Sequence, residues 1–236
     1  MTTRIHTLAS VAAKQTDQHV LFDIAATLSG IADAAIDDLA AGQQLIQSYD
    51  VTIDDGSGGT AMETVTVTLT GTNDAVVVTA EDLAGAVTED DADPTLTDSG
   101  TLAFEDADLS DVHTASAVFA GTTHSGQLGS LSASVTADTT GTGSGGVVTW
   151  NFAVGNVAVQ FLGAGETIVE TYTVSLTDDE GSTLTRDVAV TITGTNDRPV
   201  LTIGEATADA EEGDGAATLS ASGALLFSDL DAADTV

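Results

Sequence analysis

A ten-residue stretch occurs twice in this chain. It reads Val-Thr-Val-Thr-Leu-Thr-Gly-Thr-Asn-Asp at residues 65–74 and Val-Ala-Val-Thr-Ile-Thr-Gly-Thr-Asn-Asp at residues 188–197, an offset of 123 residues. Up to the glycine, apolar residues alternate with Thr or Ala, which is the two-residue period of a half-buried β-strand. The polar, turn-forming Thr-Asn-Asp then ends the strand. The pattern predicts a repeat array of β-domains.

The repeated stretches divide the 236 residues into four parts. Residues 1–19 have no counterpart and receive no role, and residues 20–74 match the back half of a unit. Residues 75–197 form one complete unit, and residues 198–236 begin the front half again. Both ends therefore cut through a unit, and we expect the chain to be a fragment of a longer protein.

Short alternating segments separated by turn residues fill the complete unit. In each copy a segment that starts with Tyr49 or Tyr172 leads through an Asp/Gly turn into the Val-rich strand, so the pair reads as a β-hairpin. One helical turn is expected at residues 34–41, ended by Gly42. Seven or eight strands without a long helical period favour an all-β, antiparallel β-sandwich with Greek-key connections. The other strand candidates are residues 76–79, 100–104, 112–119, 128–135 and 147–152.

The charge of the chain excludes several classes of partner. Four Lys and Arg stand against 37 Asp and Glu, a formal net charge of -33. Nucleic acids and anionic membranes are excluded because binding phosphates needs clustered Lys and Arg. No apolar run is long enough to span a bilayer, so we expect no membrane insertion. The same charge opposes compaction, and we expect bound cations to offset it.

Three acidic clusters recur at fixed places in the 123-residue period. One lies in the junction after each Val-rich strand. Another is the stretch at residues 88–93, with a counterpart at 211–214, and the third is the loop at 104–111, repeated at 227–234. The candidate metal ligands in these clusters are Asn73, Asp74, Glu89, Glu105, Asp106, Asp108, Asp111, Asn196, Asp197, Asp229, Asp231 and Asp234.

The chemistry of these residues indicates calcium. A loop with carboxylates at positions i, i+2 and i+5, as at Asp106, Asp108 and Asp111, can turn three oxygens inward, and calcium takes about six to eight oxygen ligands. Hard oxygen ligands, with no cysteine and no paired histidine, favour calcium or magnesium over zinc or copper. The alternative is that these loops are only solvated turns. Recurrence of all three clusters at one period favours the metal.

The junction motif Gly-Thr-Asn-Asp-x-Pro-Val, complete at residues 194–200, resembles the VCBS repeat, together with Trp150-Asn-Phe and residues 165–172. That family occurs in very long bacterial surface proteins of the RTX-adhesin kind, and the resemblance covers about residues 27–236. It implies tandem immunoglobulin-like or cadherin-like β-domains, calcium at or near the junctions, type I secretion to the cell surface, and a role in cell adhesion or biofilm formation. The first junction departs from the motif, because Ala75-Val76 replaces Arg-Pro.

Catalytic interpretations are weaker. Asp98-Ser-Gly resembles an aspartic-protease triplet, but the aligned residues 221–223 read Ala-Ser-Gly, so the second carboxylate is missing. His124 precedes Ser125 in a Gly-rich loop without an evident oxyanion loop. His113 is expected to be an outward or half-buried residue of a strand. We therefore predict no catalytic residues and no enzyme activity.

A ligand-binding module of a large secreted protein or extracellular hydrolase is the alternative function. The alternate threonines of residues 64–72 could present hydroxyls to a glycan, and Trp150 could stack on a sugar. Threonine is, however, the ordinary solvent-facing residue of a strand, and the apolar neighbours of Trp150 favour a core position. The sequence thus favours a non-catalytic extender segment. Its expected partners are neighbouring repeats, with cell-surface or matrix glycans as further candidates.

Overall fold

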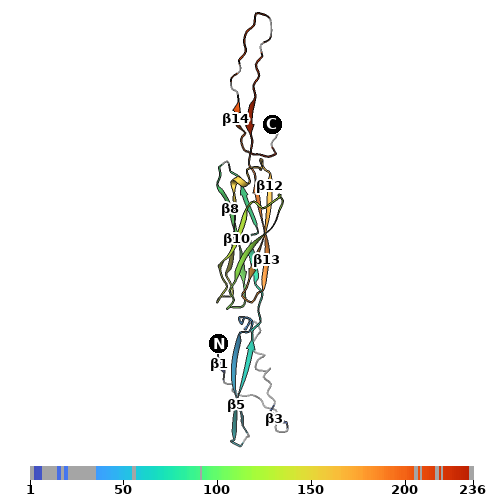
Figure 1. Ribbon diagram of the computed structural model, residues 1–236. Helices are drawn as coiled ribbons and strands as arrows, with labels where there is room; N and C mark the ends of the chain where they lie inside the picture. The colour runs from blue at the N-terminus through green and yellow to red at the C-terminus, as the bar shows by residue number, and fades with distance from the viewer. Residues whose placement is uncertain are drawn as a thin grey trace.

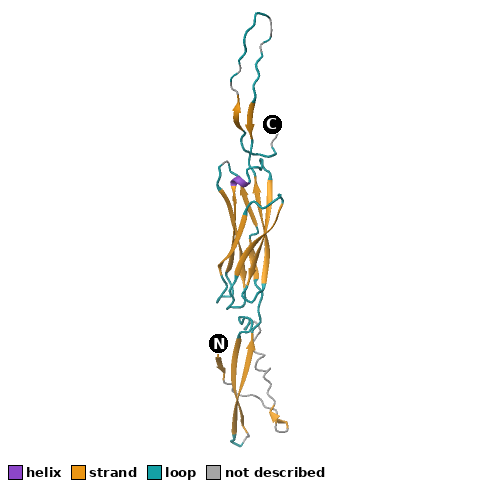
Figure 2. Ribbon diagram, in the orientation of Figure 1, coloured by secondary structure: helices purple, strands orange, loops and turns teal. Residues whose placement is uncertain are grey.

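The computed structural model describes residues 3–6, 15–16, 19–20, 36–54, 57–90, 92–204, 207, 209–215, 218 and 220–233. A β-sandwich lies in the middle of an elongated chain, with β5 toward one end and β14 toward the other (Figure 1). Among the described residues the only helix is the 3-10 turn η2 (Asn156–Ala158), and strands dominate (Figure 2). The predicted all-β class is confirmed. No helix in these ranges is long and apolar enough to cross a membrane.

Two four-stranded sheets form the sandwich, in the orders β10-β11-β8-β6 and β7-β13-β12-β9. All neighbours in these sheets are antiparallel except β7 and β13. The strands of the chain are β1 (Thr3–His6), β2 (Gln15–Thr16), β3 (His19–Val20), β4 (Gln44–Asp54), β5 (Thr60–Thr70), β6 (Val77–Glu81), β7 (Ala84–Thr88), β8 (Thr95–Glu105), β9 (Thr114–Thr122), β10 (Ser130–Ala137), β11 (Gly146–Gly155), β12 (Thr167–Thr177), β13 (Thr183–Thr193), β14 (Val200–Gly204) and β15 (Leu225–Ser228).

The strand β7 was not predicted. Because β7 pairs with β13 in parallel, the prediction of a purely antiparallel sandwich is wrong at this edge. After β6 the chain crosses to the other sheet, where the Ala189 N–H donates to the Leu83 carbonyl at 2.9 Å. Because β7 runs on in the direction of β6, it meets β13 in parallel. Gly85 permits a close approach there, since a Cβ at this position would lie 3.1 Å from Trp150 and from Val190.

The core lies between the two sheets and is centred on Trp150. This side chain is 0% exposed, and its Nε1–H donates to the Asp82 carbonyl at 2.7 Å. Gly100 pairs with Trp150 on the adjacent strand, and a Cβ there would lie 2.5 Å from the indole. The core position predicted for Trp150 is confirmed. Other buried members are Leu102, Phe104, Val148, Phe152, Tyr172, Val174, Val188, Val190 and Ile192.

The hairpins β4–β5 and β12–β13 have the same register at an offset of 123 residues. Gln44 pairs with Thr70, and Thr167 pairs with Thr193. One cross-strand hydrogen bond occurs in both hairpins with its donor and acceptor exchanged between the strands. Thr64 Oγ1 donates to Asp50 in the first hairpin, and Thr173 Oγ1 donates to Asp187 in the second, both at 2.7 Å. Matching pairs of this kind stabilise a sheet locally.

A glycine is required where each of these hairpins ends. A Cβ at Gly71 would lie 1.9 Å from the Leu39 carbonyl oxygen, and a Cβ at Gly194 would lie 2.3 Å from that of Leu162. No side chain fits at such distances, so the preceding loop packs directly on the strand end. The helical turn expected at residues 34–41 is a single turn at 36–38 and not a helix in its described part.

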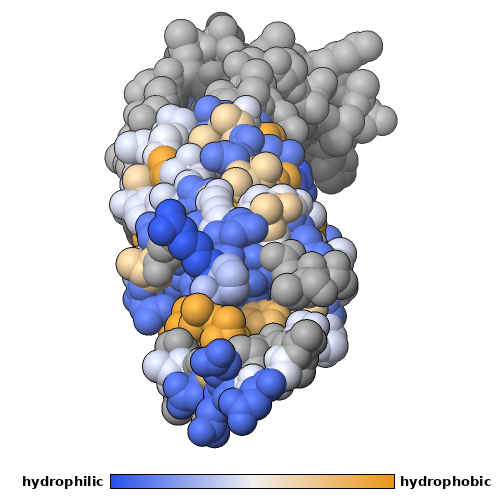
Figure 3. All heavy atoms as spheres, turned by 90° about the horizontal axis from the view of Figure 1, so that it is seen from above, coloured by the Kyte–Doolittle hydropathy of each residue, from blue (hydrophilic) through white to orange (hydrophobic). Residues whose placement is uncertain are grey.

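The strands β14 and β15 pair as β6 and β8 do. A register shift lies between Leu201 and Ile203, at the same position of the unit as the shift in β6. Phe227 is 46% exposed, whereas its counterpart Phe104 is 1% exposed in the sandwich. Seen from above, the described surface is mostly hydrophilic, with isolated apolar areas (Figure 3).

Candidate metal centre

Three segments that are distant in sequence meet at the first junction: the linker after β5, the loop after β8 and the turn between β12 and β13. The loop and the turn lie at the same end of the sandwich because each follows a strand that runs toward that end. The polar residues that they bring together are Asn73, Asp74, Asp106, Asp108, Asp111, Asp178, Asp179 and Glu180.

Hydrogen bonds hold the linker against the loop. The Asp74 N–H donates to Asp108 Oδ2 at 2.6 Å, and the Asp108 N–H donates to Asp106 Oδ1 at 3.0 Å. Asn73 Nδ2 donates to the Asp74 carbonyl at 2.8 Å and to Asp178 Oδ2 at 3.4 Å. The polar side chains therefore cannot turn outward without breaking these bonds.

Acidic side chains converge in this cluster, and some of its buried oxygens have no donor. Ligand oxygens of Asp106, Asp111 and Asp178 lie within 4.8 Å of one another, and all three side chains are buried. Within the described part of the chain, Asn73 Oδ1, Asp108 Oδ1 and Asp111 Oδ2 are buried and have no hydrogen-bond partner. Unpaired buried oxygens are rare because their desolvation is unfavourable. This donor set fits a hard divalent cation.

The cluster also perturbs its own acids. Burial raises the pKa of Asp111 to about 7, and the hydrogen bond and charge of Glu180 add to the effect, with the charges of Asp108 and Asp106. Burial likewise raises the pKa of Asp108, although the Asp74 N–H opposes the shift. The ionised forms of Asp108 and Asp111 are thus disfavoured in this cluster, and a bound cation would stabilise them.

The metal-free protein is expected to lose stability as the pH rises from about 4 to about 7. Asp111 has an ordinary pKa of 3.8 and a folded pKa of about 7, so the folded state binds the proton more tightly. That stabilisation is complete below the ordinary pKa and is lost as the pH rises through the folded pKa. Thermal unfolding of chelator-treated protein across this range measures the effect. An unfolding midpoint that climbed with pH would contradict the assignment.

His113 lies behind the cluster, and the prediction of an outward or half-buried histidine is wrong, because the side chain is 4% exposed. Its Nε2 lies 3.0 Å from Asp106 Oδ2, and its Nδ1 lies 2.7 Å from Asp138 Oδ1. Burial lowers the pKa of His113, but the bonds and charges of Asp138 and Asp106 outweigh burial and raise it overall. The imidazolium form is favoured because both ring nitrogens face carboxylates.

The second junction repeats the bonds of the first, 123 residues later. The Asp197 N–H donates to Asp231 Oδ2 at 2.9 Å, and the Asp231 N–H donates to Asp229 Oδ1 at 3.2 Å. Asn196 Nδ2 donates to the Asp197 carbonyl at 2.5 Å. Asp231 Oδ1 is buried and lacks a hydrogen-bond partner among the residues described. The predicted ligand Asp234 lies outside the described residues.

Two predicted ligands, Glu89 and Glu105, lie outside the groups of converging acidic oxygens in the described ranges. Glu89 lies at the other end of the sandwich and belongs to the second junction, where its Oε2 accepts the Thr195 N–H at 2.9 Å. Glu105 is exposed at the end of β8, where it lines a shallow depression with Asp74 and Asp106. Glu105 is in neither of the two groups of converging acidic oxygens found in the described ranges.

The turn between β12 and β13 was missed as part of the site. Asp178 is 4% exposed and converges with Asp106 and Asp111, and Asp111 also converges with Asp179 and Glu180. The signal was present in the sequence, since an acidic turn occurs in both copies. The counterpart of Asp178 is Asp55, which lies outside the described residues.

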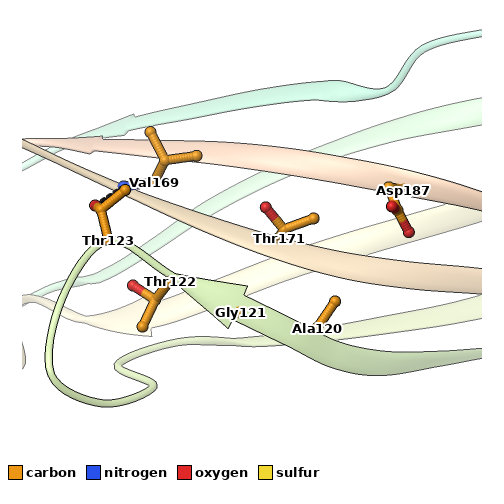
Figure 4. Close-up of a pocket in the computed structure, with 7 residues that line it drawn as sticks. All are labelled: Ala120, Gly121, Thr122, Thr123, Val169, Thr171 and Asp187. Atoms are coloured by element: carbon orange, nitrogen blue, oxygen red, sulfur yellow. Dashed lines mark hydrogen bonds between the residues drawn. The ribbon is translucent and has the colours of Figure 1, made fainter.

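A shallow groove of about 450 Å³ lies over β9, β12 and β13 (Figure 4). Its lining consists of Ala120, Gly121, Thr122, Thr123, Val169, Thr171 and Asp187. Hydroxyl groups are present, but none of these seven residues is an aromatic one that a sugar ring could stack on. The Asp187 carboxylate already accepts a bond from Thr173. The groove therefore lends little support to glycan binding.

The two catalytic candidates, Asp98 and His124, contact nearby backbone groups. Asp98 accepts the Ala86 N–H at 2.7 Å and the Ser99 N–H at 2.8 Å. His124 Nδ1 lies 3.3 Å from the Gly126 carbonyl. Neither contact supplies a second carboxylate or a nucleophile.

No protein-family model and no curated protein sequence matches the chain. Similar solved structures include AggA, the major subunit of aggregative adherence fimbriae type I from Escherichia coli, at 11% identity and a TM-score of 0.31, covering 52% of this chain and 97% of AggA. The cadherin-like domains 1 to 4 of zebrafish RET match at 11% identity and a TM-score of 0.30, covering 64% of this chain and 34% of the matched chain. The Protocadherin GammaB4 extracellular domain matches at 16% identity and a TM-score of 0.30, covering 69% of this chain and 24% of the matched chain. Such low values transfer no function to this chain.

Proposed function

We propose that this chain is a non-catalytic extender segment of a secreted bacterial surface protein. Its units are immunoglobulin-like or cadherin-like β-sandwiches in tandem, with a period of 123 residues and boundaries after residues 74 and 197. One observation carries the proposal: the linker-to-loop bond from Asp74 to Asp108 recurs from Asp197 to Asp231. At both boundaries, therefore, the backbone N–H of the equivalent linker residue donates to the carboxylate of the equivalent loop residue.

The ion proposed for these junctions is Ca²⁺. It would neutralise the negative charge of the acidic oxygens. The hydrogen bonds between the linker and the loop would hold those oxygens in place. At the first junction the proposed ligands are Asn73, Asp74, Glu105, Asp106, Asp108 and Asp111, joined by Asp178; at the second they are Glu89, Asn196, Asp197, Asp229, Asp231 and Asp234.

Direct contacts between neighbouring units support a stiffening role. Gln43 Nε2 donates to Ser110 Oγ at 2.6 Å across the first junction, and the Ala232 N–H donates to the Phe161 carbonyl at 3.1 Å across the second. Bending at a junction would separate these groups and pull ligand oxygens apart. A bound cation would therefore resist bending, which is what a segment that sets reach requires.

The biological setting that we propose is the bacterial cell surface or biofilm matrix, reached by type I secretion, with a role in adhesion. The VCBS-type motif at residues 194–200 and the charge of -33 support this setting. The partners would be neighbouring units of the same chain and, beyond them, surface or matrix glycans. Neither nucleic acid nor membrane is a proposed partner.

Calcium is expected to raise thermal stability and to lengthen the particle. Extracellular calcium modules bind at about 0.1 to 1 mM, and at ten to a hundred times that constant each site adds about 1.4 to 2.7 kcal/mol. The unfolding midpoint should then rise by roughly 5–10 °C. Calorimetry and small-angle scattering, each with calcium, with magnesium and with chelator, measure both effects. If calcium altered neither quantity, the metal assignment would be withdrawn.

A further inference from the structure

A buried pair of side chains supports the metal centre from behind. His113 Nδ1 lies 2.7 Å from Asp138 Oδ1, and the backbone N–H of His113 donates to Asp138 Oδ2 at 3.1 Å. Asp138 Oδ1 also accepts the Thr139 N–H at 2.8 Å. The carboxylate of Asp138 is thus fixed by backbone groups, and it fixes one side of the imidazole.

The imidazole cannot readily turn away from this position. Its second nitrogen, Nε2, lies 3.0 Å from Asp106 Oδ2, and the ring of Phe104 packs edge-on at 4.9 Å between centroids. Thr139 beside it is 0% exposed. Rotation would break two charge-assisted bonds and leave both nitrogens buried without partners, which is strongly unfavourable.

Asp106 is therefore held from two directions. Oδ2 is bonded to His113, and Oδ1 accepts the Asp108 N–H at 3.0 Å. Two contacts on different oxygens set the plane of a carboxylate. Each oxygen can accept more than one bond, so both remain able to bind a cation beside Asp111 and Asp178, whose oxygens lie within 4.8 Å.

We propose that His113 is a positioning residue for the metal centre, and that the chain Asp138–His113–Asp106 holds the Asp106 carboxylate in its ligand orientation. The inference rests on the proposed calcium function. Partners of this kind, one layer behind a metal ligand, typically change metal affinity about 10- to 100-fold. His113 lies outside the acidic clusters that recur with the period, so the repeat pattern alone does not single it out.

Calcium titration of the whole chain tests the proposal. His113→Leu is expected to weaken calcium binding about 10-fold, and Asp138→Asn is expected to weaken it less, in the same direction. The decisive measurement is a double-mutant cycle: in an Asp106→Asn background, His113→Leu should have little further effect, because the ligand that it positions is gone. An unchanged or tighter affinity in both single variants, or additive losses in the cycle, would overturn the proposal.

Lanthanide luminescence separates positioning from general destabilisation. If Asp106 no longer reaches the ion, terbium bound in place of calcium should hold an additional water in His113→Leu. The additional water is seen as a larger difference between the luminescence decay rates in H2O and D2O than the unaltered chain shows. A purely structural role would leave that count unchanged.

Glu170→Gln is the matched control for these variants. Glu170 is a fully buried carboxylate remote from the cluster, bonded to the Leu128 and Gly129 N–H groups and to the Tyr172 hydroxyl. Its counterpart in the first hairpin is Gln47, so the chain already uses glutamine there. The control should alter stability and leave calcium affinity unchanged.

Should His113→Leu fail to fold, Asp138→Asn carries the test, because it keeps the imidazole and alters only its anchor. Folding is checked by the fluorescence of Trp150, the single tryptophan. If the unaltered chain bound no calcium, the proposed function would fail. If it bound calcium and all variants bound equally well, only the role of His113 would fail.

Discussion

Replacing Asp111 with asparagine is expected to stabilise the metal-free protein and, at the same time, to weaken calcium binding about 100-fold, equivalent to about 2.7 kcal/mol. The two effects have one cause. Asp111 is common to both groups of converging acidic oxygens, and its Oδ2 is buried without a hydrogen-bond partner in the described ranges. Its charge opposes folding when no cation is bound and attracts the cation when one is present.

Thermal unfolding in chelator and calorimetric calcium titration, both near pH 8, measure the two effects. Asp187→Asn is the matched control, since it also removes one negative charge, but from an exposed site on β13. The control should change neither quantity appreciably. If Asp111→Asn destabilised the metal-free protein, or bound calcium as the unaltered chain does, the assignment of Asp111 as a calcium ligand would fail.

Replacing Gly100 with valine is expected to destabilise the sandwich by about 3 kcal/mol, at the upper end of the range for overpacked cores. A Cβ at Gly100 would lie 2.5 Å from Cζ2 of Trp150 and 2.7 Å from Cε2. The indole cannot move aside easily, because it is fully buried and its Nε1–H is bonded to the Asp82 carbonyl. The backbone must therefore shift or the indole must leave its position.

Gly121→Val is the control for that experiment. Gly121 lies on β9, and a Cβ built there meets nothing within 4 Å. Denaturant unfolding followed by circular dichroism should show a loss for Gly100→Val and a change within about 0.5 kcal/mol for Gly121→Val. Equal losses in the two variants would mean that the contact with Trp150 is not what requires a glycine at residue 100.

Local patterns predicted the strands well. Alternation of apolar and polar residues is a property of neighbours in sequence, so the segments that begin at Tyr49 and Tyr172 lie within β4 and β12. The loop carboxylates Asp106 and Asp108 were identified for the same reason, because their spacing alone brings them to one loop. The short strand β7 was missed, since five small residues carry too weak an alternation to separate it from a loop.

Residues joined across the fold were harder to predict. Asp178 reaches the first junction from a turn that is 105 residues away from Asn73, and Asp138 meets His113 across 25 residues. Glu89 was predicted in an acidic stretch of its own at residues 88–93, and its spacing gave no sign that it bonds to Thr195, 106 residues later, at the other end of the sandwich from the Asp106 loop. Such pairings depend on strand order, which alternation does not encode.

The sequence by itself determined the all-β class, the offset of 123 residues between matched hairpins and the supply of acidic oxygens at each boundary, because these follow from short-range periodicity and composition. Only the tertiary structure decided which carboxylates share a cluster and which histidine lies behind it. The physical reason is that strand direction and sheet order determine which loops meet at one end of a sandwich, and burial there determines which oxygens lose water.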